Sequence, residues 1–351
     1  MGRSGVHIDW VILACSVVLT SLGLATLLSI DINFFWSQLI FAVIGIALAI
    51  LVARIDFSIY PYFDRYIYFF CLLLLALSYL GPNVSGATRW LEIGGVRLQP
   101  SEFVKPWLLL SWASLLVRYP PEKWRYLLRH VALFLLPFGL VFFQPDLGNA
   151  IVYTTMWVGA VVLAGVSLWY VILAGGTLLV LLPTLYELLH DYQKLRILTF
   201  LYPQLDPQGA GYNALQSLIT IGSGQWWGRG FARGPQSLLN FLPEHHTDFI
   251  FAAFSEEFGL IGALILLTIF LILLWRLLKR TREQVESPIA FIYGISLFMQ
   301  LVTQVVINVG MNMGLVPITG ITLPFVSAGG SSLLATWMGL GIFMATLKRR
   351  A

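Results

Sequence analysis

The sequence predicts an all-α polytopic membrane protein with about ten transmembrane helices. Of its 351 residues, 58% are hydrophobic and only 11% are charged, whereas a soluble domain carries about 25% charged residues. The apolar residues fall into long runs, and the few Lys and Arg residues are unevenly distributed among the segments between them. This composition excludes a disordered chain, a collagen-like chain and a nucleic-acid-binding protein.

Ten apolar runs account for most of the chain. A helix that crosses a bilayer needs about 20 predominantly apolar residues. The first run is too long for the apolar core of a signal peptide and no small-residue cleavage site follows it, so we expect it to remain as an anchor. No shift in composition divides residues 1–351, which are expected to form one transmembrane domain. The predicted spans are roughly 10–30, 37–53, 64–80, 103–117, 127–143, 149–165, 168–189, 248–275, 288–309 and 331–347.

The distribution of basic residues predicts the orientation. With ten spans, both termini face the same side of the membrane. Placing them inside puts 14 of the 21 Lys and Arg residues in inner segments and 7 in outer ones, so the positive-inside rule predicts that both termini are cytoplasmic. The long loop over 190–247, between spans seven and eight, is then extracytoplasmic. Loops of that length are usually functional or disordered, and its Gly and aromatic content argues against disorder.

A first cluster of polar residues lies at the outer start of span four. Charge at membrane depth is costly, so the cluster of Trp90, Arg97, Gln99, Glu102 and Lys105 is a functional candidate. Glu102 and Lys105 are three residues apart and can pair on one helix face. One interpretation is a capped helix start with a structural ion pair. We favour a site for an anionic ligand, because an Arg, a Glu and a Lys converge at one membrane edge.

A second cluster enters span eight with His245, His246 and Asp248. Its spacing matches no HExxH or related zinc pattern, which argues against metal-ligating histidines. Asp248 is a candidate general base, because an Asp at the mouth of a helix can accept a proton. The alternative is a helix N-cap, which is the interpretation that we favour for Asp146 before span six.

Three further segments need an interpretation. Glu256 and Glu257 lie deeper in span eight, and a structural tie between helices and a catalytic role are both open. Two prolines and three glycines within 317–332 exclude a continuous helix and predict a re-entrant loop that lines a site, with the amides of 329–332 available to an anion. The glycine-rich stretch 222–230 lacks the strand and the GK[ST] of a phosphate-binding loop, so a nucleotide cofactor is not expected.

Taken together, these segments resemble the SEDS family (shape, elongation, division and sporulation) over almost the whole chain. FLPEHHTDFIF and the DPQGAGYN stretch look more like the elongation branch, RodA, than the division branch, FtsW. Asn149, Ala328 and the run 225–227 depart from the family pattern, which concerns local loop shape. The motifs that carry the resemblance are GATRW, QPSEFVK, QPDLG, DPQGAGYN with IGSG, FLPEHHTDFIFA, EEFGLIG and PITGITLPFVSAGGSS.

The resemblance implies a ten-span peptidoglycan glycosyltransferase. Such a protein polymerises lipid II, an undecaprenyl-pyrophosphate-linked disaccharide-pentapeptide, at the outer face of the cytoplasmic membrane during cell elongation. A class B penicillin-binding protein is the implied partner, together with other membrane proteins of the elongation complex. By motif, Asp248 would be the catalytic base. The candidate substrate-binding residues are Trp90, Arg97, Gln99, Glu102, Lys105, His246 and Ser331.

The chemistry of a site outside the cell is consistent with this resemblance. Sugar nucleotides and ATP are absent there, so the donor must carry its own leaving group. Arg97 and Lys105 could neutralise a leaving pyrophosphate, and a divalent cation, Mg²⁺ or Mn²⁺, could share that task. Asp248 would deprotonate the acceptor hydroxyl in one inverting displacement. A transporter that flips a lipid-linked precursor is the main alternative, although its site should lie near the midplane. A scaffold that recruits cell-wall enzymes is another.

Overall fold

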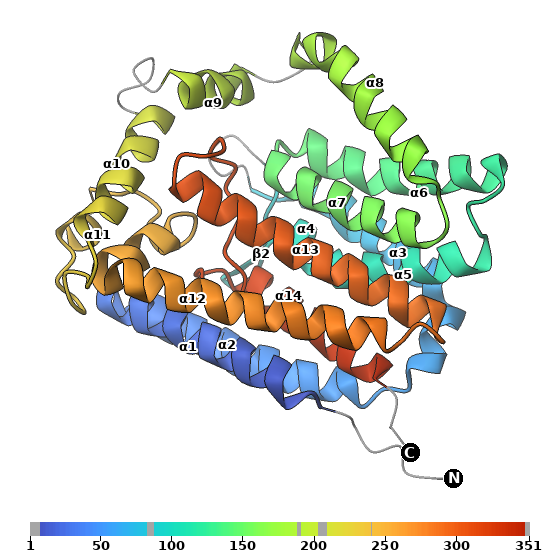
Figure 1. The fold of residues 1–351 in the computed structure, drawn as a ribbon, viewed down its shortest axis with the longest axis horizontal. Coiled ribbons are helices and arrows are strands. Elements are labelled where there is room, and N and C mark those ends of the chain that lie inside the picture. The colour runs from blue at the N-terminus through green and yellow to red at the C-terminus, as the bar shows by residue number, and fades with distance from the viewer. Residues whose placement is uncertain (1–7, 83–87, 188–190, 203–208, 240, 348–351) are drawn as a thin grey trace.

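The computed structural model describes residues 8–82, 88–187, 191–202, 209–239 and 241–347, which form a bundle of α-helices (Figure 1). Each predicted span overlaps one helix, except the fourth, which two helices cover, and the described part of the predicted 190–247 loop contains three more. The helices are α1 (Trp10–Ile30), α2 (Ile32–Ala53), α3 (Tyr60–Leu77), α4 (Pro100–Phe103), α5 (Lys105–Arg118), α6 (Trp124–Phe143), α7 (Leu147–Leu163), α8 (Leu168–Glu187), α9 (Asp191–Leu201), α10 (Ala210–Ser223), α11 (Pro235–Leu238), α12 (Ile250–Arg282), α13 (Pro288–Asn312) and α14 (Gly330–Thr346).

The lengths and composition of these helices confirm a polytopic helical membrane protein. Six of the described helices are long and apolar enough to cross a membrane, namely α1, α2, α3 with its flanking 3₁₀ turns, α6, α12 and α13. α7, the first part of α8 and α14 are shorter apolar helices. α4 and α5 together cover the fourth predicted span and are separated at Val104.

Polar contacts at both ends hold α1 against α12. Asp9, the N-cap of α1, pairs with Arg276 at 2.9 Å and with Arg280 near the end of α12. At the other end of α1, Ser29 donates a hydrogen bond to Glu257 in the first part of α12. The two helices therefore run antiparallel, with apolar packing between two polar ends.

α2 and α14 run parallel in close contact. A Cβ at Gly45 of α2 would lie 2.8 Å from the ring of Trp337, and a Cβ at Gly341 of α14 would lie 2.7 Å from the backbone of Ala49. Small residues of this kind allow helices to approach closely where lipid provides no hydrophobic driving force between them. The contact also brings the start of α14 beside the start of α2.

The segment between α13 and α14, residues 313–329, is not helical, as the prolines and glycines predict. Its apolar side chains Leu323 and Phe325 are buried. The side chain of Gln38 in α2 donates to the carbonyl of Ser327 (2.8 Å) and accepts from the N–H of Gly329 (3.2 Å). Irregular backbone at membrane depth requires such partners, because lipid supplies none.

α12 is broken at Gly259, whose φ of 67° is not helical. The segment 225–230 pairs with the break. The N–H of Leu260 donates to the carbonyl of Gln225 (2.8 Å), and the N–H of Gly230 donates to the carbonyl of Glu257 (3.0 Å). The stretch that resembles a phosphate-binding loop therefore supplies hydrogen-bond partners to a broken membrane helix.

A short β-hairpin, which the sequence analysis did not predict, precedes α4. Strand β1 (Leu91–Ile93) pairs with β2 (Val96–Leu98) in antiparallel register, with Glu92 opposite Arg97. Gly94 and Gly95 form the turn with φ of 60° and 81°, and two consecutive glycines favour this geometry in a two-residue turn. The hairpin fixes the direction in which the chain enters α4.

We predict that Gly259→Ala destabilises the protein by at least about 1–3 kcal/mol. The left-handed backbone disfavours any side chain, and a Cβ would collide with the backbone of Gly228. Gly139→Ala is the matched control, since Gly139 lies within α6 with open space around it and a helix interior favours Ala. Thermal unfolding in detergent measures both variants. Equal midpoints would contradict the proposed pairing at the break.

Candidate functional site

A cavity of about 420 Å³ opens at one end of the bundle, where four segments meet. These segments are the hairpin with the start of α4, the turn before α12, the non-helical loop before α14, and the start of α14 itself. The cavity is lined by Arg89, Trp90, Arg97, Gln99, Glu102, Glu244, Thr247, Asp248, Gly320, Thr322, Ala328, Gly329, Gly330, Ser331 and Ser332.

Gln99 ties the hairpin to two helices. Its N–H donates to the hydroxyl of Ser331 (2.9 Å), and its side-chain amide donates to Asp146 (2.8 Å). Asp146 also accepts from the N–H of Asn149 (3.2 Å), so the predicted N-cap of α7 is confirmed. Asn149, which departs from the family pattern, donates its side-chain amide to the same carboxylate (2.9 Å). These bonds fix the wall that carries Arg97 and Glu102.

Glu102 faces the cavity, and Lys105 lies behind it. The ammonium of Lys105 is 2.7 Å from Glu102 Oε1, and the two side chains are 0% and 7% exposed, respectively. Lys105 is not part of the cavity lining. The structural ion pair that the spacing allows is therefore present, and it neutralises a buried carboxylate. Spacing alone could not decide which member of the pair would face a ligand.

Asp248 lies in the turn before α12, where two amides of α13 fix its backbone. Asn308 and Asn312 each donate a hydrogen bond of 3.0 Å to its carbonyl. Asn312 also accepts from the N–H of Ala252 (3.1 Å), so it caps the first turn of α12 from a neighbouring helix. The N-cap residue is Phe249, without a side-chain capping bond. Asp248 is thus not the N-cap that the alternative interpretation required.

Cationic and anionic groups share the cavity. Arg89 and Arg97 lie on the hairpin side, and Glu244 and Asp248 belong to the turn before α12. The carboxylate of Asp248 is close to Gly320, where a Cβ would lie 3.4 Å from its Oδ2. The first amides of α14 lie on the same wall and add the positive end of a helix dipole. The cavity therefore suits an anion held next to a carboxylate.

Asn308 and Asn312 are not among the residues predicted from the sequence. Both side chains are fully buried, and their spacing of four residues places them on one face of α13. Two amides at helical spacing inside an apolar span are a signal that could have identified them. Their role is to hold Asp248 and the non-helical loop, since Asn308 also donates to the carbonyl of Ile321 (2.7 Å).

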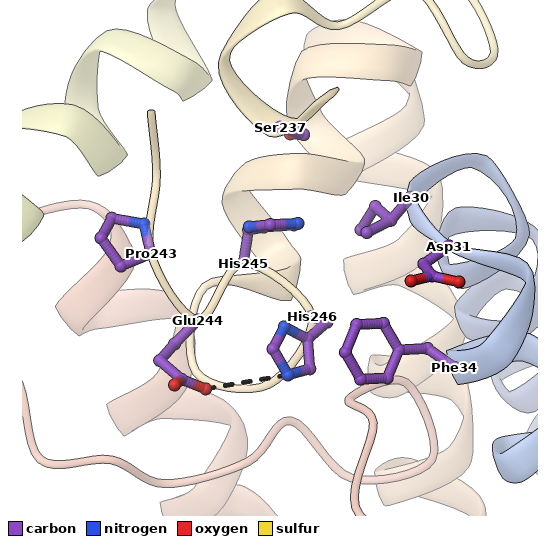
Figure 2. Close-up of a pocket in the computed structure, with 8 residues that line it drawn as sticks. All are labelled: Ile30, Asp31, Phe34, Ser237, Pro243, Glu244, His245 and His246. Carbon is purple, nitrogen blue, oxygen red and sulfur yellow. Dashed lines mark ion pairs between the residues drawn. The ribbon is translucent and has the colours of Figure 1, made fainter. Parts of the chain in front are cut away.

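His246 lies in a second, smaller pocket that Figure 2 shows. Its ring stacks on Phe34 with centroids 4.0 Å apart, and its Nε2 is 3.8 Å from a carboxylate oxygen of Glu244. Glu244 lines both pockets. Among the candidates, His246 and Lys105 do not line the cavity, whereas the structure brings together Trp90, Arg97, Gln99, Glu102, Asp248 and Ser331.

Among the described residues, no three His, Cys, Asp or Glu side chains are close enough together to hold a metal ion. A divalent cation near Glu244 and Asp248 would need oxygen atoms from a ligand to complete its coordination, as Mg²⁺ commonly does with phosphates.

The bundle and its cavity define a class of polytopic membrane protein whose polar site, with cationic and carboxylate groups, lies at the ends of several helices. Residues 6–351 match the FtsW/RodA/SpoVE family of cell cycle proteins, and the chain belongs to this family. It is 38% identical over 305 residues to the peptidoglycan glycosyltransferase MrdB of Escherichia coli, and this alignment covers 86% of this chain and 82% of MrdB. It is 35% identical over 360 residues to the probable peptidoglycan glycosyltransferase FtsW of Coxiella burnetii, and that alignment covers 95% of this chain and 94% of the relative.

Solved structures agree with this assignment. One is described as "Structural coordination of polymerization and crosslinking by a peptidoglycan synthase complex", with 30% identity, a TM-score of 0.83 and 96% of both chains covered. The rod shape determining protein RodA of Thermus thermophilus has 28% identity and a TM-score of 0.73 over 97% of both chains. The resemblance to the SEDS family is thereby confirmed.

We predict that Lys105→Met destabilises the protein by about 3–5 kcal/mol, because it leaves the Glu102 carboxylate buried without its partner. Lys194→Met is the control. Its ammonium lies 3.8 Å from the exposed Glu187, and such a surface pair contributes about 0–1 kcal/mol. Thermal unfolding in detergent compares the two variants. A Lys105→Met protein of unchanged stability that has lost ligand binding would instead indicate direct contact with the ligand.

Proposed function

We propose that this chain is a peptidoglycan glycosyltransferase of the elongation type, which polymerises lipid II into glycan strands. The observation that carries the proposal is one cavity lined both by the fixed acid Asp248 and by two arginines, Arg89 and Arg97. Transfer from a pyrophosphate-linked donor requires a base for the acceptor and cations for the leaving group. The names of MrdB and FtsW among the relatives support the same activity.

Asp248 acts as the general base. It takes the proton of the acceptor hydroxyl as that oxygen attacks the anomeric carbon of the donor. The same displacement breaks the bond from this carbon to the pyrophosphate oxygen and inverts the carbon. Because pyrophosphate leaves as an anion, no second carboxylic acid has to protonate it, unlike in most glycosidases. Asn308 and Asn312 support the step by fixing the backbone of the base.

Arg97 and Arg89 bind the leaving pyrophosphate. A guanidinium can hold phosphate oxygens with two parallel hydrogen bonds, and the first amides of α14 beside Ser331 add further donors. Lys105, which the sequence analysis assigned to this task, acts indirectly. Its charge cancels that of Glu102, so the carboxylate does not repel the anion.

A divalent cation is a separate part of the proposal. Mg²⁺ is commonly held by one or two carboxylates together with substrate phosphates, and Glu244 is the cavity carboxylate closest in sequence to the base. Mn²⁺ accepts similar ligands. The base and the arginines perform the steps above whether or not a cation is bound with the phosphates.

We place the cavity at the outer face of the cytoplasmic membrane, with a class B penicillin-binding protein as partner. The orientation rests on the excess of Lys and Arg in the predicted inner segments. The partner rests on the similarity to a structure described as a peptidoglycan synthase complex that coordinates polymerisation and crosslinking. Other membrane proteins of the elongation complex are expected to associate with the same chain.

We predict that Asp248→Asn reduces polymerisation at least about 100-fold, because a general base contributes about 10²–10⁴-fold to a rate. The purified chain is given lipid II in detergent, with and without its partner, and glycan strands are resolved on a gel. Asp56→Asn is the matched control, since Asp56 caps a short turn and does not line the cavity, and Asn also caps. Thermal midpoints establish that both variants fold.

The same assay separates the proposal from a transporter or a scaffold. Detergent removes the membrane barrier, so strands formed there are made by an enzyme. If the chain forms no strands alone or with its partner, the enzymatic proposal is wrong. If Asp248→Asn forms strands at the wild-type rate, Asp248 is not the base.

A further inference from the structure

The second pocket, of about 280 Å³, borders the cavity but has a different chemistry. Figure 2 shows Phe34 and His246 ring to ring, with Asp31 and Glu244 at opposite ends of this stacked pair. His245 lies beside them. The pocket lies below the size range of about 300–1,000 Å³ that is usual for larger ligands, so it fits a small group such as one sugar ring.

One turn separates the two spaces. In the turn from Glu244 to Asp248, the side chains of His245 and His246 face the second pocket, Thr247 and Asp248 face the cavity, and Glu244 lines both. The turn is also tied to the non-helical loop before α14, because the N–H of Ala328 donates to the carbonyl of His246 (2.9 Å). A ligand in the second pocket therefore lies against the segment that carries the base.

The two glutamates of α12 hold the sides of this pocket. Glu256 accepts hydrogen bonds from the N–H and the hydroxyl of Ser237 (3.1 and 2.8 Å), which lines one side. Glu257 accepts from Ser29, directly before Ile30 and Asp31 on the other side. These carboxylates, whose role the sequence left open, thus position two pocket walls. Walls held by buried hydrogen bonds of this kind are typical of a preformed site.

The described lining of the second pocket offers two carboxylates and aromatic rings, with no Lys or Arg. Burial lowers the pKa of His246, although Glu244 and Asp31 act in the opposite direction, so the ring is largely neutral at pH 7. Its Nδ1 is buried without a hydrogen-bond partner in the described structure. Nδ1 of His245 bonds the carbonyl of Leu242 (2.6 Å) and must donate to it. This leaves Nε2 of His245 for a ligand.

We propose that this pocket binds a phosphate-free sugar ring of the lipid-linked substrate, next to the cavity that binds its pyrophosphate. Hydroxyl groups of the ring donate to Asp31 and Glu244 and pair with the imidazoles, and the apolar face of the ring packs near Phe34. The described lining of this pocket has no cation to bind pyrophosphate, whereas the cavity has Arg89 and Arg97, so pyrophosphate is expected in the cavity. The inference rests on the proposed function, because it assigns a part of the same substrate.

The test uses the whole purified chain in detergent and the β-1,4-linked disaccharide of N-acetylglucosamine as probe. Saturation-transfer NMR measures its binding, with pyrophosphate as a competitor. Asp31→Asn and Phe34→Leu should each weaken disaccharide binding about tenfold, the effect of losing one bond to a charged group or its packing partner. Asn retains the N-cap of α2 that Asp31 provides. Arg97→Gln should leave disaccharide binding unchanged and weaken pyrophosphate binding.

Three results would overturn the inference: no saturation transfer to the disaccharide on the wild type, displacement of the disaccharide by pyrophosphate, or equal weakening by Arg97→Gln. Mg²⁺ that displaces the disaccharide would likewise assign the pocket to a cation. Thermal midpoints check that each variant folds. Glycan synthesis is measured separately. Disaccharide binding through Asp31 without strands contradicts the proposed function, and strands without such binding contradict this inference alone.

Discussion

Where a membrane helix breaks, its free backbone N–H and C=O groups need hydrogen-bond partners, and the rest of this structure depends on this constraint. Lipid offers no hydrogen bonds, so every break needs partners from the protein. Residues 225–230 supply them at Gly259 in α12, and Gln38 supplies them to the loop before α14. Asn312 supplies one to the first turn of α12. Each of these breaks is therefore held in place by hydrogen bonds from the protein itself.

This support determines where the chemistry can occur. A base must keep its orientation while charge develops on its substrate, and a residue on a mobile loop would lose much of its effect. Asp248 is outside a helix but is fixed by two amides of a neighbouring one. Glu256 and Glu257, within α12, hold two walls of the second pocket through hydrogen bonds from Ser237 and Ser29. Polar residues at membrane depth thus act here mainly as supports, and the reactive groups lie at the ends of helices.

Much of the fold could be predicted from the sequence, and the reasons are physical. Apolar runs of span length identified each membrane helix, and prolines with glycines identified the loop before α14. The candidates around Asp248 and Arg97 were found because charge is rare in such a chain. Lys105 was predicted to line the cavity but lies behind Glu102. The spacing of the two residues shows that their side chains share a helix face, but it does not show which of them faces a cavity. The supports Asn308 and Asn312 carry no charge, and their partners are backbone atoms 13 to 64 residues away, which no local pattern reveals.

The sorting of charge between the two spaces gives the turn before α12 its importance. The cavity contains two arginines and the start of α14 together with carboxylates, whereas the described lining of the second pocket contains two carboxylates and two imidazoles but no Lys or Arg. A substrate with phosphate at one end and sugar at the other would be oriented by this difference before any specific contact forms. The bond that reacts in glycosyl transfer is the one between sugar and phosphate. Asp248 lies on the segment between the cavity proposed for pyrophosphate and the pocket proposed for a sugar ring, so under the proposed function the base would be located where that bond is held.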